Sequence, residues 1–133
     1  MGGRRARALS GAVLDAGALI AFERGDRSMV VLVARAAEIG GTLVVPAAAL
    51  AQVWRDGRRQ ARLGRLLATR LCEVVPLDAL AARLAGQLCG VAGTADVVDA
   101  SVVVEARRGG HRVVTSDPRD LARLDPTLEL VVV

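Results

Sequence analysis

The sequence predicts a single α/β domain, a three-layer α/β/α sandwich with a mostly parallel sheet of about five short strands. Its length of 133 residues suits one domain. Hydrophobic residues, mostly Ala, Val and Leu, make up 53% of the chain, which is enough for a core and too much for intrinsic disorder. Short apolar runs without polar alternation are separated by helical segments, which is the pattern of strands that helices cover on both faces.

Turn and capping residues define the first elements. An apolar strand at 12–14 ends at Asp15, and a helix follows up to the Gly25-Asp26 turn. A second helix is expected at 27–38, because Gly40-Gly41 comes directly after it. Residues 1–9 are interpreted as a basic tail, and residues 10–133 as the domain.

The middle of the chain carries the next strand and a long helical region. Residues 42–45 form an apolar strand, and Pro46 suits the first position of a helix. That helix is expected to run from 47 to about 56 and to continue past Gly57 into a basic helix at 58–69. A third strand follows at 71–75.

The next helix begins at Asp78, a good N-cap residue, and is expected to end at Gly90. Leucines at helical spacing give it an apolar face, which consists of Leu77, Leu80, Leu84 and Leu88. We expect part of this face to be hidden in a symmetric homodimer.

The last elements complete the alternation. A helix at about 96–108 ends at Gly109-Gly110, and a strand at 112–115 follows. Asp117-Pro118 opens a short helix, and residues 128–133 form the closing strand.

The composition excludes several classes of protein. The chain has 18 Arg and no Lys, so it lacks the lysine that P-loop NTPases, phosphoacceptor receiver domains and Schiff-base enzymes require. The single histidine, His111, cannot form a His-rich zinc site and is expected in a surface turn. Cys72 and Cys89 are interpreted as small buried hydrophobic residues in a reducing compartment. Asp15 interrupts the apolar stretch after the N-terminal arginines, which argues against a signal peptide, and we expect a cytoplasmic protein.

Positive charge is concentrated in two places. The net charge is +4, and three arginines lie in the tail. Residues 55–70 hold six arginines against one aspartate, whereas the remainder of the chain is acidic. A basic patch of this kind suits a polyanion such as RNA, although an ordinary solvated helix face has the same composition. The residues predicted to bind RNA are Arg55, Arg58, Arg59, Arg62 and Arg65.

Acidic residues gather where ligands bind in parallel sheets, beyond the carboxyl ends of the strands. Asp15 ends the first strand and Asp117 follows the fourth, while Asp96 and Asp99 lie three apart at the start of one helix. Asp99 is the least easily explained, because its helix is apolar on nearly every side. Converging carboxylates without a local base are typical ligands of Mg²⁺ or Mn²⁺. Helix capping is the competing interpretation for Asp96 and Asp117.

Three segments resemble the PIN domain family. Val13-Leu14-Asp15-Ala16-Gly17-Ala18-Leu19-Ile20-Ala21 resembles its opening strand and helix. Asp96-Val97-Val98-Asp99-Ala100 and the segment 113–121 resemble its third and fourth acidic motifs. The likeness is greatest to VapC-type toxins of type II toxin–antitoxin systems. The resemblance implies an α/β/α metal-dependent ribonuclease, usually a homodimer, that a small antitoxin neutralises by placing a basic or bulky residue in the acidic pocket.

By this resemblance, Asp15, Asp99 and Asp117 bind Mg²⁺ or Mn²⁺, and Thr115 or Ser116 is a polar helper. Asp96 is an additional catalytic acid, one helical turn before Asp99. The second acidic motif departs from the family, because Gln52 stands where a Glu is expected.

We therefore expect a metal-dependent endoribonuclease, with an RNA substrate and a cognate antitoxin. The alternative is a catalytically weak PIN-like module that binds RNA or a partner protein, which the uncharged Gln52 favours. A phosphohydrolase of small phosphate esters is less favoured, since the arginine-rich segment suits a longer polyanion.

Overall fold

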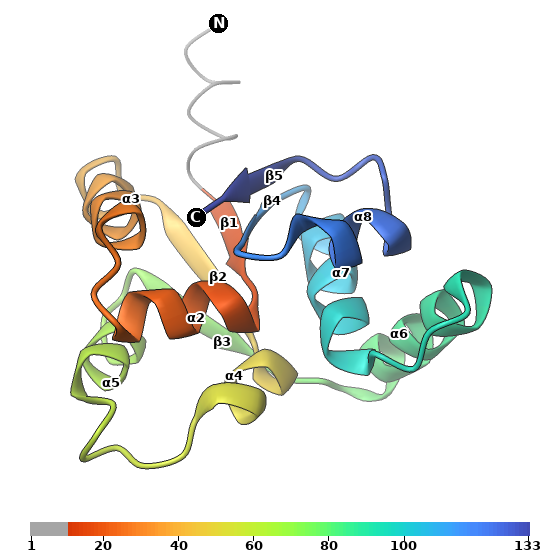
Figure 1. The fold of residues 1–133 in the computed structure, drawn as a ribbon, viewed down its shortest axis with the longest axis horizontal. Coiled ribbons are helices and arrows are strands. Elements are labelled where there is room, and N and C mark those ends of the chain that lie inside the picture. The colour runs from red at the N-terminus through yellow and green to blue at the C-terminus, as the bar shows by residue number, and fades with distance from the viewer. Residues whose placement is uncertain (1–10) are drawn as a thin grey trace, which may run out of the picture.

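The computed structural model describes residues 11–133, and the predicted tail at 1–9 lies outside this range. These residues form a five-stranded sheet in the order β3-β2-β1-β4-β5, and every neighbouring pair is parallel (Figure 1). The strands are β1 (Gly11–Leu14), β2 (Thr42–Pro46), β3 (Cys72–Val75), β4 (Arg112–Thr115) and β5 (Leu130–Val132). The predicted fold class is confirmed.

Helices cover both faces of the sheet, with α2, α3 and α5 on one side and α6, α7 and α8 on the other (Figure 1). The short helix α4 packs against both α2 and α7. The helices are α2 (Ala16–Glu23), α3 (Arg27–Glu38), α4 (Ala47–Val53), α5 (Ala61–Leu67), α6 (Ala79–Ala92), α7 (Val97–Gly109) and α8 (Pro118–Leu124). Within residues 11–133, no single helix is long and apolar enough to span a membrane, and only α6 with α7, bent by 114°, meets that test as a pair.

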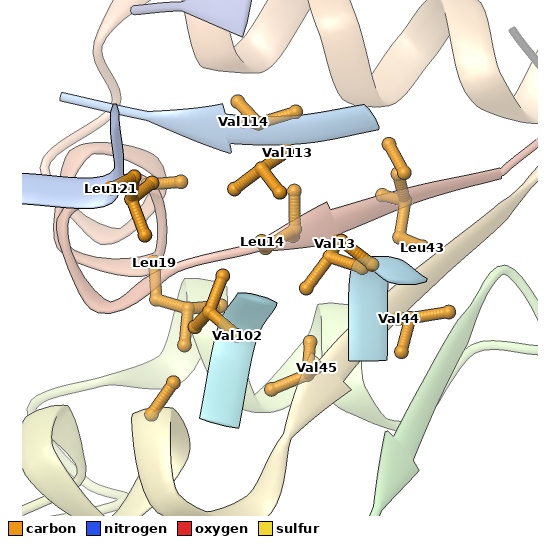
Figure 2. Packing of buried hydrophobic residues seen from close by; sticks show 14 of the residues in the cluster. Val13, Leu14, Leu19, Leu43, Val44, Val45, Val102, Val113, Val114 and Leu121 are labelled. Atoms are coloured by element: carbon orange, nitrogen blue, oxygen red, sulfur yellow. The ribbon is translucent and has the colours of Figure 1, made fainter. Parts of the chain in front are cut away.

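The core consists of small aliphatic side chains between these layers. Figure 2 shows Val13 of β1 and Val45 of β2 near Val102 of α7, and all three belong to one buried cluster. The apolar composition of α7 follows from this position, because the helix packs on β1, β2 and β4. Asp99, in the first turn of α7, therefore lies beside a largely apolar layer.

The continuous helix predicted from 47 through 69 is wrong. Helix α4 ends at Val53, and helix α5 begins only at Ala61. The Gln60 side chain holds the intervening loop, because its Oε1 accepts the amides of Arg55 and Asp56 at 2.7 and 3.0 Å. Its Nε2 also donates to the Val53 carbonyl at 2.8 Å. One side chain thus satisfies backbone groups that a helix would have paired internally. Pro46 likewise ends β2 and takes the N-cap position of α4, not its first helical position.

Helix α6 is longer than predicted. Its N-cap is Asp78 as expected, with Oδ1 accepting the Ala81 amide at 2.8 Å, but the helix continues past Gly90. It ends at Gly93, whose φ of 69° is the left-handed conformation that favours glycine. Its buried face consists of Ala81, Ala85 and Cys89, so the leucines predicted to form an apolar face point largely to solvent.

Two further expectations concern single side chains. His111 is half-buried, not in an open surface turn, because its imidazole packs against the backbones of Gly11 and Gly109. Both cysteines are free thiols; Cys89 is buried, and burial raises the pKa of Cys72 to about 11. The interpretation as a small buried hydrophobic residue is confirmed for Cys89, whereas Cys72 is only half-buried.

Candidate active site

The acidic residues lie at the switch point of the sheet. The chain leaves β1 toward β2 on one side, and β4 lies on the other side of β1. In open parallel sheets, ligands bind at this point, beyond the carboxyl ends of the strands. Asp15 directly follows β1 and Asp117 comes two residues after β4. Both predicted strand-end acids are therefore placed at the edge where a ligand is expected.

Asp15 is the N-cap of α2 and is only 5% exposed. Its Oδ1 accepts the Ala18 amide at 2.8 Å, which uses part of the carboxylate. Burial raises the pKa of Asp15, and the negative charge of Asp117 adds to that rise. The fully buried Thr115 hydroxyl and the Ala18 amide oppose it by favouring the ionised form. Thr115 thus lies beside Asp15, and its role as a polar helper stays a prediction.

Asp99 lies in the first turn of α7 and is half-buried. The pKa of Asp99 is raised to about 7. Burial is the largest cause, and the charge of Asp96, a hydrogen bond with Asp96 and the charges of Asp15 and Asp120 add to it. Asp96 is the N-cap of α7, because its Oδ1 accepts the Asp99 amide at 3.0 Å. The capping interpretation of Asp96 is confirmed, and the same residue also faces Asp99 as a second acid.

Asp117 occupies the N-cap position of α8, but its side chain caps nothing there. Instead its own amide donates to the Thr115 Oγ1 at 2.9 Å. The interpretation of Asp117 as a helix cap is therefore wrong, and its carboxylate accepts no hydrogen bond within residues 11–133. An N-cap acid that does not cap its helix is available for a ligand.

Asp120 is a functional candidate that the sequence analysis left unassigned. It lies in the first turn of α8, and its charge contributes to the raised pKa of Asp99. Asp96, Asp99 and Asp120 line a small cavity of about 90 Å³. The position of Asp120, three residues after Asp117 on a helix, was the available signal. Arg123 also lines this cavity, so a positively charged side chain that is distant from Asp99 in sequence lies near it in the fold.

Ser116, the other predicted helper, lies beside Gly17 and close to Asp15. Its Oγ occupies the space where a side chain at Gly17 would stand, and Asp15 Oδ1 lies 3.5 Å from the same point. Gly17 is thus needed for the close approach of the segment after β4 to the start of α2. The exposed Ser116 hydroxyl lies next to the acidic edge as a consequence.

The donor chemistry of this region suits a hard divalent cation. Within residues 11–133, none of the acids at 15, 96, 99, 117 and 120 forms an ion pair. The acids repel one another, and this repulsion contributes to the raised pKa values of Asp15 and Asp99. A bound cation would reduce the repulsion. In the present side-chain arrangement, however, no three acidic, histidine or cysteine side chains of the described residues stand close enough to share one ion. The charges of these acids influence one another's pKa, but the side chains do not surround a common metal position.

Gln52 lies on α4, which begins at the same edge of the sheet, and its side chain is exposed. Helix α4 packs against α2 and α7. The Gln52 side chain itself has no described contact with the acids. Its assignment as a substitute for the expected Glu stays a prediction.

The predicted RNA-binding arginines lie on the exposed loop 54–60 and on α5. Arg55 is partly engaged, because its Nη1 donates to the carbonyls of Ala51 and Trp54 at 3.1 and 2.7 Å. Arg62 lies over the backbone of Gly25. Arg58, Arg59 and Arg65 are exposed, and they take part in no ion pair within residues 11–133. The patch therefore exists, but as a loop followed by a short helix.

A sequence profile of the PIN domain family matches residues 12–125. The chain belongs to the PIN domain family, which confirms the resemblance of its motifs. Among solved structures, it is similar to a chain of VapBC2 from Rickettsia felis, in a crystal structure of that complex bound to a DNA fragment from the promoter. The TM-score is 0.71 at 17% identity, and the alignment covers 92% of this chain and 98% of that chain. This likeness supports the fold. No curated protein sequence matches the chain.

Proposed function

We propose that the protein is a metal-dependent endoribonuclease and the toxin of a type II toxin–antitoxin pair. The observation that carries the proposal is the group of acids at 15, 96, 99, 117 and 120, which lack ion pairs within the described residues at the switch point of the sheet. Family membership supports it, because this edge carries the acidic motifs that the PIN resemblance identifies. An RNA substrate makes the cytoplasm the expected site of action.

Asp15, Asp99 and Asp117 would hold Mg²⁺ or Mn²⁺, with Asp96 and Asp120 adding negative charge around them. The bound cation would lower the pKa of a water molecule and stabilise charge on the phosphodiester. Thr115 favours the ionised form of Asp15 and holds the amide of Asp117, so it positions two of the acids. Burial, and after it the charges of the neighbouring acids, raises the pKa of Asp99 to about 7, and loss of its proton is needed before it can act as a ligand.

The loop 54–60 and α5 would hold the RNA on either side of the cut. Arginine side chains bind phosphates without reading sequence, and their contribution decreases as salt increases. Arg58, Arg59 and Arg65 are the strongest candidates, because they are exposed and free of ion pairs within residues 11–133.

A cognate antitoxin is the proposed partner. The support is the similarity to a chain of a VapBC2 complex, together with an acidic edge to which a basic side chain of a partner would be attracted. Such a side chain would compete with the cation for Asp99.

A homodimer is proposed through the apolar face of α6. Leu80 and Leu84 of α6 are 56% and 36% exposed, and Leu77, just before the helix, is 42% exposed, so three leucines near one another in sequence are open to solvent. Leu80→Glu is expected to give a monomer in light scattering at micromolar concentration, whereas Val31→Glu on α3 is not. A wild-type protein that is monomeric under these conditions would contradict the homodimer.

The endoribonuclease is tested with the purified chain on a structured RNA. We expect cleavage with Mn²⁺ or Mg²⁺, none with EDTA, and recovery when the metal is restored. RNA binding without cleavage at saturating Mn²⁺ would instead favour the catalytically weak module, for which the uncharged and exposed Gln52 is the specific support.

A further inference from the structure

Two arginines on α8 have no role in the function proposed so far. Arg119 and Arg123 are both exposed, and their spacing of four residues places them one turn apart on the same face of the helix. Helix α8 packs against α7, on the face of the sheet opposite α5 (Figure 1). The α8 arginines, Arg119 and Arg123, therefore lie on the other side of the sheet from the arginines of α5.

Arg123 lies beside the acids of the candidate active site. Together with Asp96, Asp99 and Asp120, it lines the cavity of about 90 Å³. This cavity has room for a few water molecules, and therefore for a phosphate group but not for a whole nucleotide. Acids alone would repel a phosphate. A guanidinium in the same cavity supplies the opposite charge, and its fork of N–H donors matches two phosphate oxygens.

Neither α8 arginine forms an ion pair within residues 11–133, although Asp120 lies on the same helix and Asp117 just before it. Three other arginines that lie beside acids do form ion pairs: Arg107 with Asp125 at 2.8 Å, Arg108 with Glu105 at 3.3 Å and Arg112 with Glu129 at 2.7 Å. Arg119 also stands in the first turn of α8, where the helix dipole disfavours a cation, so helix stability does not explain its position. The charge of Arg123 is likewise available to a ligand of the cavity.

We propose that Arg123 binds the phosphate that is cut, and that Arg119 binds the next phosphate along the RNA. The proposal rests on the proposed nuclease function and adds a side chain that touches the substrate at the reacting group. In the hydrolysis, a water oxygen forms a bond to phosphorus, the bond to the leaving oxygen breaks, and a proton from the water ends on the leaving oxygen. Negative charge increases on the other phosphate oxygens during this step, and the Arg123 guanidinium stabilises it.

The arginines on the two sides of the sheet then contribute to different steps. Arg58, Arg59 and Arg65 hold phosphates away from the cut, so their loss weakens RNA binding and raises KM. Arg123 acts on the phosphate that gains charge in the transition state, so its loss lowers kcat. Arg119 is expected to behave like the α5 arginines, because it holds a phosphate that does not react.

Cleavage of an RNA oligonucleotide with a single mapped cut, at saturating Mn²⁺, measures this difference. Arg123→Gln is expected to lower kcat about tenfold or more, and Arg123→Lys to restore part of it, because lysine keeps the charge without the fork. Arg65→Gln should raise KM about threefold with kcat unchanged. Arg35→Gln on α3 is the matched control, because Arg35 is exposed, forms no ion pair within residues 11–133 and is not among the residues that line the cavity.

Stability and metal affinity distinguish phosphate binding from mere compensation of the acids. Phosphate binding predicts that Arg123→Gln leaves the urea stability of the metal-free protein unchanged and does not weaken Mn²⁺ binding, measured by calorimetry without RNA. A variant that loses stability, binds Mn²⁺ more tightly and keeps its kcat would show that Arg123 only offsets the charge of the acids.

The remaining results separate this inference from the nuclease function on which it rests. Unchanged kcat in both Arg123 variants, beside an active wild type, would overturn the inference and leave the nuclease function in place. An equal fall of kcat in Arg35→Gln and Arg123→Gln would also overturn it, because the effect would then be one of total charge. No cleavage by the wild type at saturating Mn²⁺ would overturn both proposals.

Discussion

The two ends of α8 present the same residue type in opposite surroundings. At the C-terminal end, Asp125 is 4% exposed but fully paired: it accepts from Arg107 Nε at 2.8 Å and from the amide and hydroxyl of Thr127 at 2.9 and 2.6 Å. Burial alone would raise the pKa of Asp125, but these donors lower it. At the N-terminal end, Asp120 and Asp117 face Asp99 and Asp15, and the pKa values of Asp99 and Asp15 are raised.

The difference separates acids that hold the fold together from acids that are available for a ligand. Asp125 joins α7 to the turn before β5, and its negative charge is compensated within the chain. The acids near Asp99 repel one another, and none of them forms an ion pair within the described residues. The exposed fractions of Asp15 and Asp125 are similar, at 5% and 4%, and the two residues differ in the donors that surround them.

The largest expected effect is that of Asp99→Asn on activity. RNA cleavage at saturating Mn²⁺ should fall about 100-fold or more, the scale of losing one preorganised electrostatic group. Stability without metal should be unchanged or higher, because one member of a repelling group is neutralised. Cleavage assays and urea denaturation measure the two effects, with the exposed Asp26→Asn as a matched control. A variant that unfolds, with no response of the wild type to metal, would make Asp99 structural.

The reverse outcome is expected for Asp125→Ala. Removing this buried acceptor leaves Thr127 and Arg107 without their partner and should lower the free energy of unfolding by about 1–3 kcal/mol. RNA cleavage per folded molecule should persist at a temperature below the transition. Loss of cleavage with unchanged stability would contradict the contrast between the two ends of α8.

The two acids should also give opposite pH dependences of stability. The pKa of Asp99 is about 7 in the folded chain against roughly 3.9 when unfolded, so its contribution to stability decreases as pH rises from about 4 to 7. The pKa of Asp125 is lowered in the folded chain, so its contribution is lost as pH falls below about 4. Urea denaturation of the metal-free protein from pH 3 to 8 measures both.

Single variants identify which residue causes each change of stability with pH. Asp99→Asn should reduce the decline toward pH 7, with the remainder due to the raised pKa of Asp15, and Asp125→Ala should reduce the loss of stability below pH 4. Saturating Mn²⁺ should reverse the decline toward pH 7 in the wild type. A flat profile in the wild type between pH 4 and 7 would show that Asp99 is ionised without cost in the folded state.

The sequence was sufficient for the fold because local signals agree with the packing. Asp78, Gly110 and the apolar strands lie where caps and strands were predicted. It failed at loop 54–60, because the hydrogen bonds of one side chain, Gln60, outweigh the helical composition around Gly57. Patterns of composition do not reveal such a contact.

The site was predictable as a set of strand-end and helix-start acids, but not in its details. Sequence spacing could not distinguish Asp96, which caps its helix, from Asp117, which occupies the equivalent position without capping. Asp120 was overlooked because its charge matters only through the fold, where α8 faces the start of α7. The distance between the carboxylates is likewise a property of tertiary packing.

The smallest expected effect tests the uncharged position at Gln52. If this residue stands near the acids, Gln52→Glu adds a negative charge and should tighten Mn²⁺ binding and raise cleavage at limiting metal. Asp96 already supplies charge to Asp99, so Asp96→Asn should weaken Mn²⁺ binding more in the wild type than in the Gln52→Glu variant. We expect a coupling on the order of 1 kcal/mol, about fivefold in affinity, from a double-mutant cycle. Additive effects would leave Asp96 as a helix cap alone. No response of Mn²⁺ affinity to Gln52→Glu would place Gln52 away from the group, and the contrast with Asp125 would then rest on Asp15, Asp99, Asp117 and Asp120.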